Sequence, residues 1–134
     1  MNKITYTVEV EDGYSAWYLN GKRHREDGPA IEGLSGYEGL SGYSAWFING
    51  NLHREDGPAV EYSNGDSGYN AWYINGELHR EDGPAIEYSN GTKKWFINGV
   101  KYTESEFKIK IQTSKDITVA ELEKLLGYKI KIIK

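Results

Sequence analysis

The heptapeptide His-Arg-Glu-Asp-Gly-Pro-Ala occurs three times without change, at residues 24–30, 53–59 and 79–85. Its imidazoles and carboxylates could act as general bases and acids, because these groups transfer protons in most enzymes that use this chemistry. Its three histidines could also bind one metal ion if their ring nitrogens converged, since zinc–nitrogen bonds are about 2.0–2.1 Å long. The heptapeptide therefore raises the alternative of a metal-dependent hydrolase.

A structural role explains the unchanged repetition better. Neighbouring residues of an extended strand point to opposite faces, so the His and Arg of one copy would not share a site. Equivalent residues of successive two-stranded units lie about 9–10 Å apart, which argues against three histidines sharing one ion. In the interpretation we favour, Asp starts a turn, Gly supplies an unusual φ and Pro stiffens the corner. We expect His to donate to a backbone carbonyl, and Arg to pair with a carboxylate or stack on an aromatic ring. No catalytic residue, metal or cofactor is predicted.

The heptapeptide is part of a longer repeat that aligns on tryptophan. The four tryptophans are separated by 29, 26 and 23 residues, and each is followed by an aromatic residue, an aliphatic residue and Asn-Gly. Asn-Gly fits a type I′ turn, which needs positive φ at both residues. A second short strand through His-Arg and a third through Ala-Ile/Val-Glu would complete the unit. The residues assigned to this framework are Trp17, Trp46, Trp72, Trp95, His24, His53, His79, Arg25, Arg54 and Arg80.

Such units bury their aromatic faces only by stacking on one another, so the predicted fold is mainly β, an antiparallel β-hairpin repeat with a small C-terminal α+β cap. Over residues 14–102 the pattern W-[YF]-x-N-G-x-x-H-x-x-x-G-P resembles the MORN repeat, and more closely the MORN-variant repeats of phage and mobile-element proteins. The resemblance implies a hairpin solenoid that serves as a scaffold or protein-binding module, without shared catalytic residues.

The predicted repeat region covers residues 1–102. It opens with a strand over 4–11, and its units start near residues 16, 45, 71 and 95.

The predicted cap covers residues 103–134. Residues 107–112 alternate and predict a strand with Phe107, Ile109 and Ile111 on one face. A short helix is the competing interpretation, since Thr103 and Glu106 have the spacing of a capping box. A second capping box, Thr118 to Glu121, predicts a helix over 119–126 that ends at Gly127. The alternating residues 128–134 predict a final strand.

Composition narrows the classes of function. The 134 residues include no cysteine, which excludes a disulfide framework and a cysteine nucleophile, and no apolar run has the length of a membrane span. Residues 1–100 have a net charge of −7 and residues 101–134 of +3. An acidic body argues against direct nucleic-acid binding and favours a basic protein partner, such as a nucleic-acid-binding host protein. The alternating N-terminal residues predict no signal peptide, hence a cytoplasmic protein, in the host-cell cytoplasm if it is phage-encoded.

Binding residues are expected where the copies differ. Residues 33–44 and 66–70 are rich in Tyr, Ser and Gly, as many binding loops are. Carboxylates spaced regularly on a sheet could also imitate nucleic-acid phosphates. The candidate binding residues are Tyr37, Glu38, Tyr43, Asp66, Tyr69, Glu32, Glu61 and Glu87.

The sequence therefore predicts a non-enzymatic protein-binding module that acts by surface occlusion. The specific hypothesis is a phage or mobile-element inhibitor of a host defence factor such as a CRISPR effector nuclease. One alternative is a protein that binds or sequesters a nucleotide between the Trp, Tyr and Arg side chains of successive units. The metal-dependent hydrolase is the second alternative. The oligomeric state is left open, and an exposed sheet edge could support a dimer.

Overall fold

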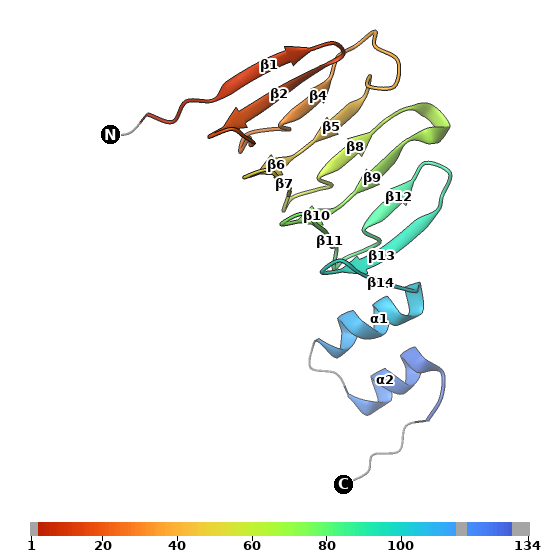
Figure 1. Cartoon of the computed structure of the whole chain (residues 1–134). Helices are drawn as coiled ribbons and strands as arrows, with labels where there is room; N and C mark the ends of the chain where they lie inside the picture. The colour runs from red at the N-terminus through yellow and green to blue at the C-terminus, as the bar shows by residue number, and fades with distance from the viewer. Residues whose placement is uncertain (1–2, 115–117, 130–134) are drawn as a thin grey trace.

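The fold is a large antiparallel sheet of hairpin-linked strands, followed by two helices (Figure 1). The computed structural model describes residues 3–114 and 118–129. The main sheet has the order β1-β2-β4-β5-β8-β9-β12-β13-β14, with β3 paired to β2. Its strands are β1 (Thr7–Glu11), β2 (Tyr14–Leu19), β3 (Lys22–Arg23), β4 (Ile31–Gly33), β5 (Tyr43–Ala45), β8 (Val60–Tyr62), β9 (Tyr69–Ala71), β12 (Ile86–Tyr88), β13 (Lys93–Ile97) and β14 (Val100–Tyr102).

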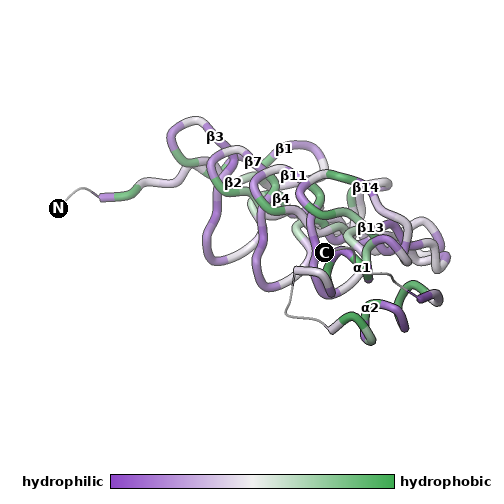
Figure 2. Tube along the Cα trace, turned by 90° about the horizontal axis from the view of Figure 1, so that it is seen from below, coloured by the Kyte–Doolittle hydropathy of each residue, from purple (hydrophilic) through white to green (hydrophobic). Residues whose placement is uncertain are grey.

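Short hairpins branch from the main sheet once in every unit. Two of them form sheets of their own: β6 (Phe47–Ile48) with β7 (Asn51–Leu52), and β10 (Tyr73–Ile74) with β11 (Glu77–Leu78). The hairpin strands β3, β7, β11 and β14 lie in a row when the molecule is seen from below (Figure 2). The predicted second strand is therefore shorter than expected, because β3, β7 and β11 each end before the histidine.

The Asn-Gly turns have the predicted backbone. The four asparagines have φ between 47° and 52°, and the glycines that follow them have φ between 77° and 82°. Positive φ at both residues is the signature of a type I′ turn, whose twist matches that of the flanking strands.

The main cluster of the core is a row of cross-strand neighbours in which small and large side chains alternate. Alanines of one strand face Ile or Val of the next, so each methyl group leaves room for a branched side chain. The row ends where Ile86 faces Lys94, at the position where earlier units have alanine. Its members in order are Ala16, Ile31, Ala45, Val60, Ala71 and Ile86.

A second row on the same face consists of tyrosines. Tyr43, Tyr62, Tyr69 and Tyr88 follow one another across the sheet with ring centroids 6.1, 6.0 and 6.0 Å apart. Burial, reinforced by neighbouring tyrosines, raises the pKa of Tyr43 and Tyr69 above 10, and the same causes raise the pKa of Tyr73. These tyrosines thus pack along the core.

The C-terminal end is helical. Helix α1 (Glu104–Thr113) begins with a capping box at Thr103 and Glu106, and it packs on β13 and β14 with Phe107 buried. The strand predicted over 107–112 is therefore wrong and the alternative helix is confirmed. Helix α2 (Val119–Leu126) is confirmed with its cap at Thr118 and a left-handed Gly127. The strand predicted over 128–134 lies mostly outside the described residues, and Tyr128 and Lys129 are in no strand.

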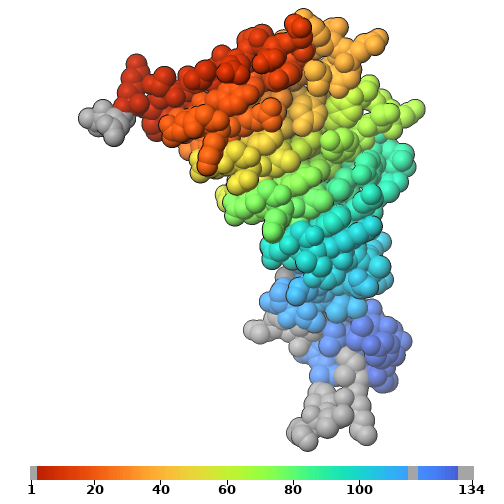
Figure 3. Space-filling view, viewed as in Figure 1, coloured from red at the N-terminus to blue at the C-terminus, as the bar shows by residue number. Residues whose placement is uncertain are grey.

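A short 3-10 helix, η1 (Gly65–Ser67), lies between β8 and β9. In a space-filling view the successive units form parallel diagonal bands, and the body narrows toward the helices (Figure 3). The opening strand predicted over 4–11 is shorter than expected, since β1 is Thr7–Glu11.

Replacing Val60 with alanine tests the core row. Val60 is 4% exposed between Ala45 and Ala71, so Val60→Ala leaves a cavity that neighbouring methyl groups do not fill. We expect the free energy of unfolding in urea to fall by about 2 kcal/mol. The matched control is Val100→Ala, at a side chain that is 54% exposed, with an expected change below about 0.5 kcal/mol. Equal effects of the two changes would contradict this core.

A pH titration tests the burial of Tyr43, Tyr69 and Tyr73. Tyr43, Tyr69 and Tyr73 keep their protons in the folded state above pH 10, where tyrosines of the unfolded chain lose theirs. Their contribution to stability is therefore constant below about pH 10 and is lost as the pH rises further. Absorbance of tyrosinate should show a late-ionising group of tyrosines, which disappears when these three are changed to Phe. Ionisation of all tyrosines in one step would contradict the prediction.

Candidate functional site

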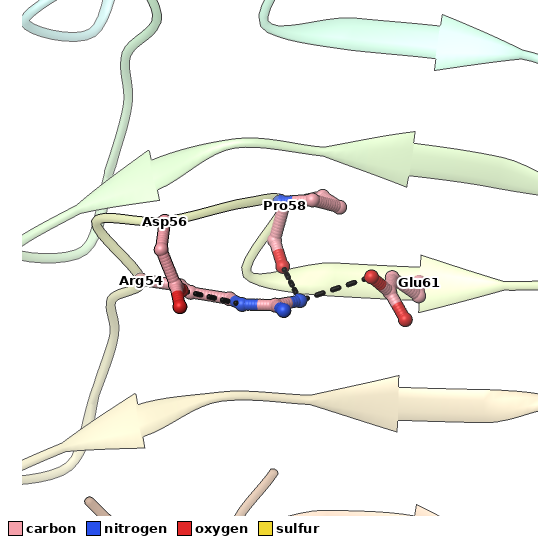
Figure 4. Close-up of polar contacts among 4 residues, drawn as sticks. All are labelled: Arg54, Asp56, Pro58 and Glu61. Atoms are coloured by element: carbon pink, nitrogen blue, oxygen red, sulfur yellow. Dashed lines mark hydrogen bonds and ion pairs between the residues drawn. The ribbon is translucent and has the colours of Figure 1, made fainter. Parts of the chain in front are cut away.

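Each copy of the heptapeptide forms a corner around its arginine, and Figure 4 shows the corner of the second unit. In the second unit, Nε of Arg54 donates to Asp56 at 3.0 Å, and Nη1 donates to the carbonyl of Pro58 at 3.0 Å and to Glu61 at 2.9 Å. The guanidinium carbon lies 3.8 Å from the centroid of the Trp46 ring. The arginine therefore ties Asp56 and Pro58 of the corner to Glu61 of the following strand. This pairing with a carboxylate and this stacking on an aromatic ring are as predicted from the sequence.

The other two corners repeat this arrangement. The distances to the Trp ring are 4.1 Å in the first unit and 3.8 Å in the third, and the distances to the strand carboxylate are 3.7 and 3.1 Å. The corresponding residues are Arg25 with Asp27, Pro29, Glu32 and Trp17, and Arg80 with Asp82, Pro84, Glu87 and Trp72.

The glycine of the corner has a different role from the one predicted. Gly28, Gly57 and Gly83 are absent from the residues with positive φ, so unusual backbone geometry is not the reason for glycine. A Cβ atom on Gly57 would instead lie 3.0 Å from the guanidinium carbon of Arg54. Glycine is needed because the arginine packs directly against its backbone.

The histidine links its unit to the next one. Nδ1 of His53 accepts a hydrogen bond of 3.0 Å from the backbone N–H of Asn75, the first residue of the next Asn-Gly turn. His24 and His79 accept in the same way from Asn49 and Asn98, at 2.9 Å each. The predicted role was donation to a carbonyl, and this is wrong, since the accepting Nδ1 carries no proton.

Two backbone hydrogen bonds complete each link. The N–H of Arg54 donates to the carbonyl of Tyr73 at 3.1 Å, and the N–H of Gly76 donates to the carbonyl of Leu52 at 2.8 Å. Equivalent bonds join the first unit to the second and the third to the fourth. Four successive units have three links between them, and each link uses one histidine. The last unit has no following turn to hold, which explains why Tyr102 stands at its histidine position.

The histidines do not converge. Each Nε2 lies 3.4–3.9 Å from the glutamate two residues later in its own unit. Within residues 3–114 and 118–129, no group of three His, Asp or Glu side chains has the arrangement of a metal site. The imidazoles hold turns instead of gathering around an ion.

Two grooves of nearly equal size lie between successive corners. The first corner groove, of about 730 Å³, is bounded by the corners of units one and two with Trp46 and Ile48 between them. The second corner groove, of about 680 Å³, is bounded by the corners of units two and three with Trp72 and Ile74. Each is lined by four carboxylates and two guanidinium groups, which gives each groove a net charge of −2.

The corner carboxylates are exposed, whereas the arginines are not. The Glu and Asp side chains of the three heptapeptides are 73–88% exposed and the arginines only 19–22%. Each arginine is held inward by the tryptophan and by the glycine backbone. The outer surface of the corners is therefore acidic, with the same groups repeated in each unit.

The eight binding residues expected from the sequence do not all form one site, although Glu61, Tyr69 and Glu87 line one pocket of about 490 Å³. Tyr43 and Tyr69 belong to the tyrosine row on the core face. The strand glutamates face the opposite side, where each is an ion-pair partner of a corner arginine. The loop residues lie at the far ends of the strands from the corners, with all of their side chains exposed: Tyr37, Glu38 and Asp66.

Sequence reasoning missed the corner carboxylates as a surface. Their unchanged repetition predicts a turn, and a structural role alone does not account for their charge. The available signal was the ratio of three carboxylates to one arginine in each unit, which leaves an excess of negative charge at every corner.

No protein-family model, curated protein or solved structure matches the chain. Within the described part of the chain, neither α1 nor α2 is long and apolar enough to span a membrane.

Substitutions of His53 test the link between units. His53→Ala removes the acceptor for Asn75, so we expect the free energy of unfolding to fall by about 1–2 kcal/mol and the Asn75 amide to exchange its hydrogen faster. His53→Asn places Oδ1 close to the former position of Nδ1, and it should restore at least half of the lost stability and the protection of that amide. Equal protection of Asn75 in the wild type and in His53→Ala would contradict the link.

Proposed function

We propose that this chain is a non-enzymatic binding module that acts by covering a basic surface of a protein partner. The observation that carries the proposal is the repeated acidic corner. Each of three units has three carboxylates and one arginine, a net charge of −6 over the series. Complementary charge of this kind steers association and selects partners by the sign of their surface.

The spacing of the corners supports a partner with a regular array of cations. Each unit contributes two strands to the main sheet, so equivalent carboxylates recur about every 9.4–9.8 Å. This spacing is set by the backbone hydrogen bonds, so an array of lysines or arginines with the same period could bind without rearrangement of the sheet.

Nucleotide binding between the repeat units is disfavoured by the same contacts. The arginine nitrogens that would bind phosphate already donate to Asp56, Pro58 and Glu61 in the second unit. Each groove also has more carboxylates than guanidinium groups. A phosphate would have to displace these partners and lie among carboxylates of the same charge. Its binding would therefore cost more free energy than the binding of a cation at the same place.

The resemblance to MORN-variant repeats makes the proposal more specific. On that resemblance the chain is a phage or mobile-element protein, and its partner is a nucleic-acid-binding host defence factor such as a CRISPR effector nuclease. The groove of such a protein is basic because it neutralises phosphates, and an acidic strip could occupy it. The expected activity is stoichiometric inhibition without turnover.

Neutralising the corner glutamates tests the proposed function. A matched pair of triple variants changes the net charge equally and differs only in position. The corner variant carries Glu26→Gln, Glu55→Gln and Glu81→Gln, and the control carries Glu9→Gln, Glu11→Gln and Glu77→Gln.

The probe is poly-L-lysine, with binding measured by calorimetry at low and at moderate salt. The wild type and the control should bind at low salt and weaken as salt is added, while the corner variant should bind at least about tenfold more weakly than the control, a loss of about 1.4 kcal/mol. Equal binding by the two triple variants would contradict a specific acidic corner surface. Loss of any partner recovered from lysate by the corner variant alone would extend the result to a natural protein.

A further inference from the structure

The two corner grooves combine an aromatic wall with acidic edges at a fixed repeat. We propose that together they bind an extended basic segment in the polyproline II conformation, with an arginine or lysine at every third residue. This inference rests on the proposed function and narrows the partner from a basic surface to one kind of peptide.

The spacing of the grooves selects the conformation. Equivalent points in the two grooves are one unit apart, or two strand spacings of about 4.7–4.9 Å each. A polyproline II helix has three residues per turn and a rise of about 3.1 Å, so its every third side chain recurs on the same side after about 9.3 Å. A β-strand repeats its face after about 6.6 Å and an α-helix after two turns, about 10.8 Å. The polyproline II repeat is the closest to that of the grooves.

The lining of the grooves matches both kinds of residue in such a segment. Trp72 and Ile74 provide an apolar wall, and aromatic-lined grooves bind proline-rich segments because the peptide is already extended and loses little entropy. Glu55 and Asp56 line both grooves, and they are exposed and able to accept from a guanidinium group. An arginine at every third residue would place one cation at each groove.

The first unit indicates how a ring can cover this surface. There the Tyr6 ring stacks on the imidazole of His24, with centroids 6.2 Å apart, and the His24 side chain is only 5% exposed. The equivalent His53 and His79 each line a corner groove and are 19% exposed. The fold thus already packs a ring on the imidazole of His24. The imidazoles of His53 and His79, which line the grooves, stay more accessible, and a pyrrolidine ring of a ligand could pack on them in the same way.

The test uses two peptides of identical composition. One is Pro-Pro-Arg repeated four times, and the other has two arginines at each end of a run of eight prolines. Both are rich in proline, so both favour polyproline II, and both have the same charge. They differ only in the spacing of their arginines. Binding to the full chain is measured by calorimetry at several salt concentrations.

Two variants locate the site. Glu55→Gln removes one charge from both grooves, and Glu77→Gln removes one from an exposed hairpin that lines neither groove. We expect the regular peptide to bind the wild type at least tenfold more tightly than its isomer. Glu55→Gln should remove most of that difference, and Glu77→Gln should leave it unchanged.

The failures are distinguishable. If both peptides bind equally and Glu55→Gln weakens both, the period-three inference is overturned while the acidic corner surface stands. If neither peptide binds but poly-L-lysine does, the inference is overturned in the same way. If neither the peptides nor poly-L-lysine bind, both proposals are overturned.

Discussion

The hydrogen bond from a turn amide to the imidazole of the preceding unit is the interaction on which the repeat depends. An Asn-Gly turn leaves the N–H of its asparagine without a partner inside its own unit. The histidine of the unit before supplies the acceptor, at 2.9–3.0 Å in all three links. The series therefore has a direction, and each unit completes the next one. The ends follow from this rule, since the last unit has no successor and loses its histidine, and helix α1 begins directly after Tyr102 with its capping box.

The same corner also sets the charge of the surface. Each arginine is held between the tryptophan ring and the glycine backbone, and its nitrogens bind a carbonyl and carboxylates of its own unit. The cation is thus fixed inward, while the Glu and Asp that begin the turn remain exposed. Structure and surface cannot be separated here, because the residues that build the repeat also produce its acidic edge.

The sequence predicts correctly those elements that depend on interactions between residues close together in the chain. The type I′ turns and the helix over 119–126 were readable because Asn-Gly and the Thr118 capping box act within a few residues. The segment 107–112 has the alternation of a strand, yet it is helical because Thr103 caps it and Phe107 is buried where α1 packs on β13 and β14. The acceptor role of the histidines could not be read from the sequence, since Asn75 lies 22 residues after His53. The glycine lies only three residues after the arginine, but the arginine packs against it because Trp46 and Glu61 hold the guanidinium group there, and these two residues lie in or next to neighbouring strands.

The insertions in the repeat preserve the spacing of the corners. The first connection is six residues longer than the third and the second is three residues longer, and the added residues lie in 34–42 and 63–68. These loops join the ends of the strands that point away from the corners, as Figure 1 shows for β8, which begins after a corner and ends in a loop. Backbone bonds such as Ser63 to Gly42 join the strand ends there. Loop length can therefore vary on one side while strand pairing keeps the corners one unit apart on the other, so the period of the acidic surface is a property of the backbone and does not change with the loops.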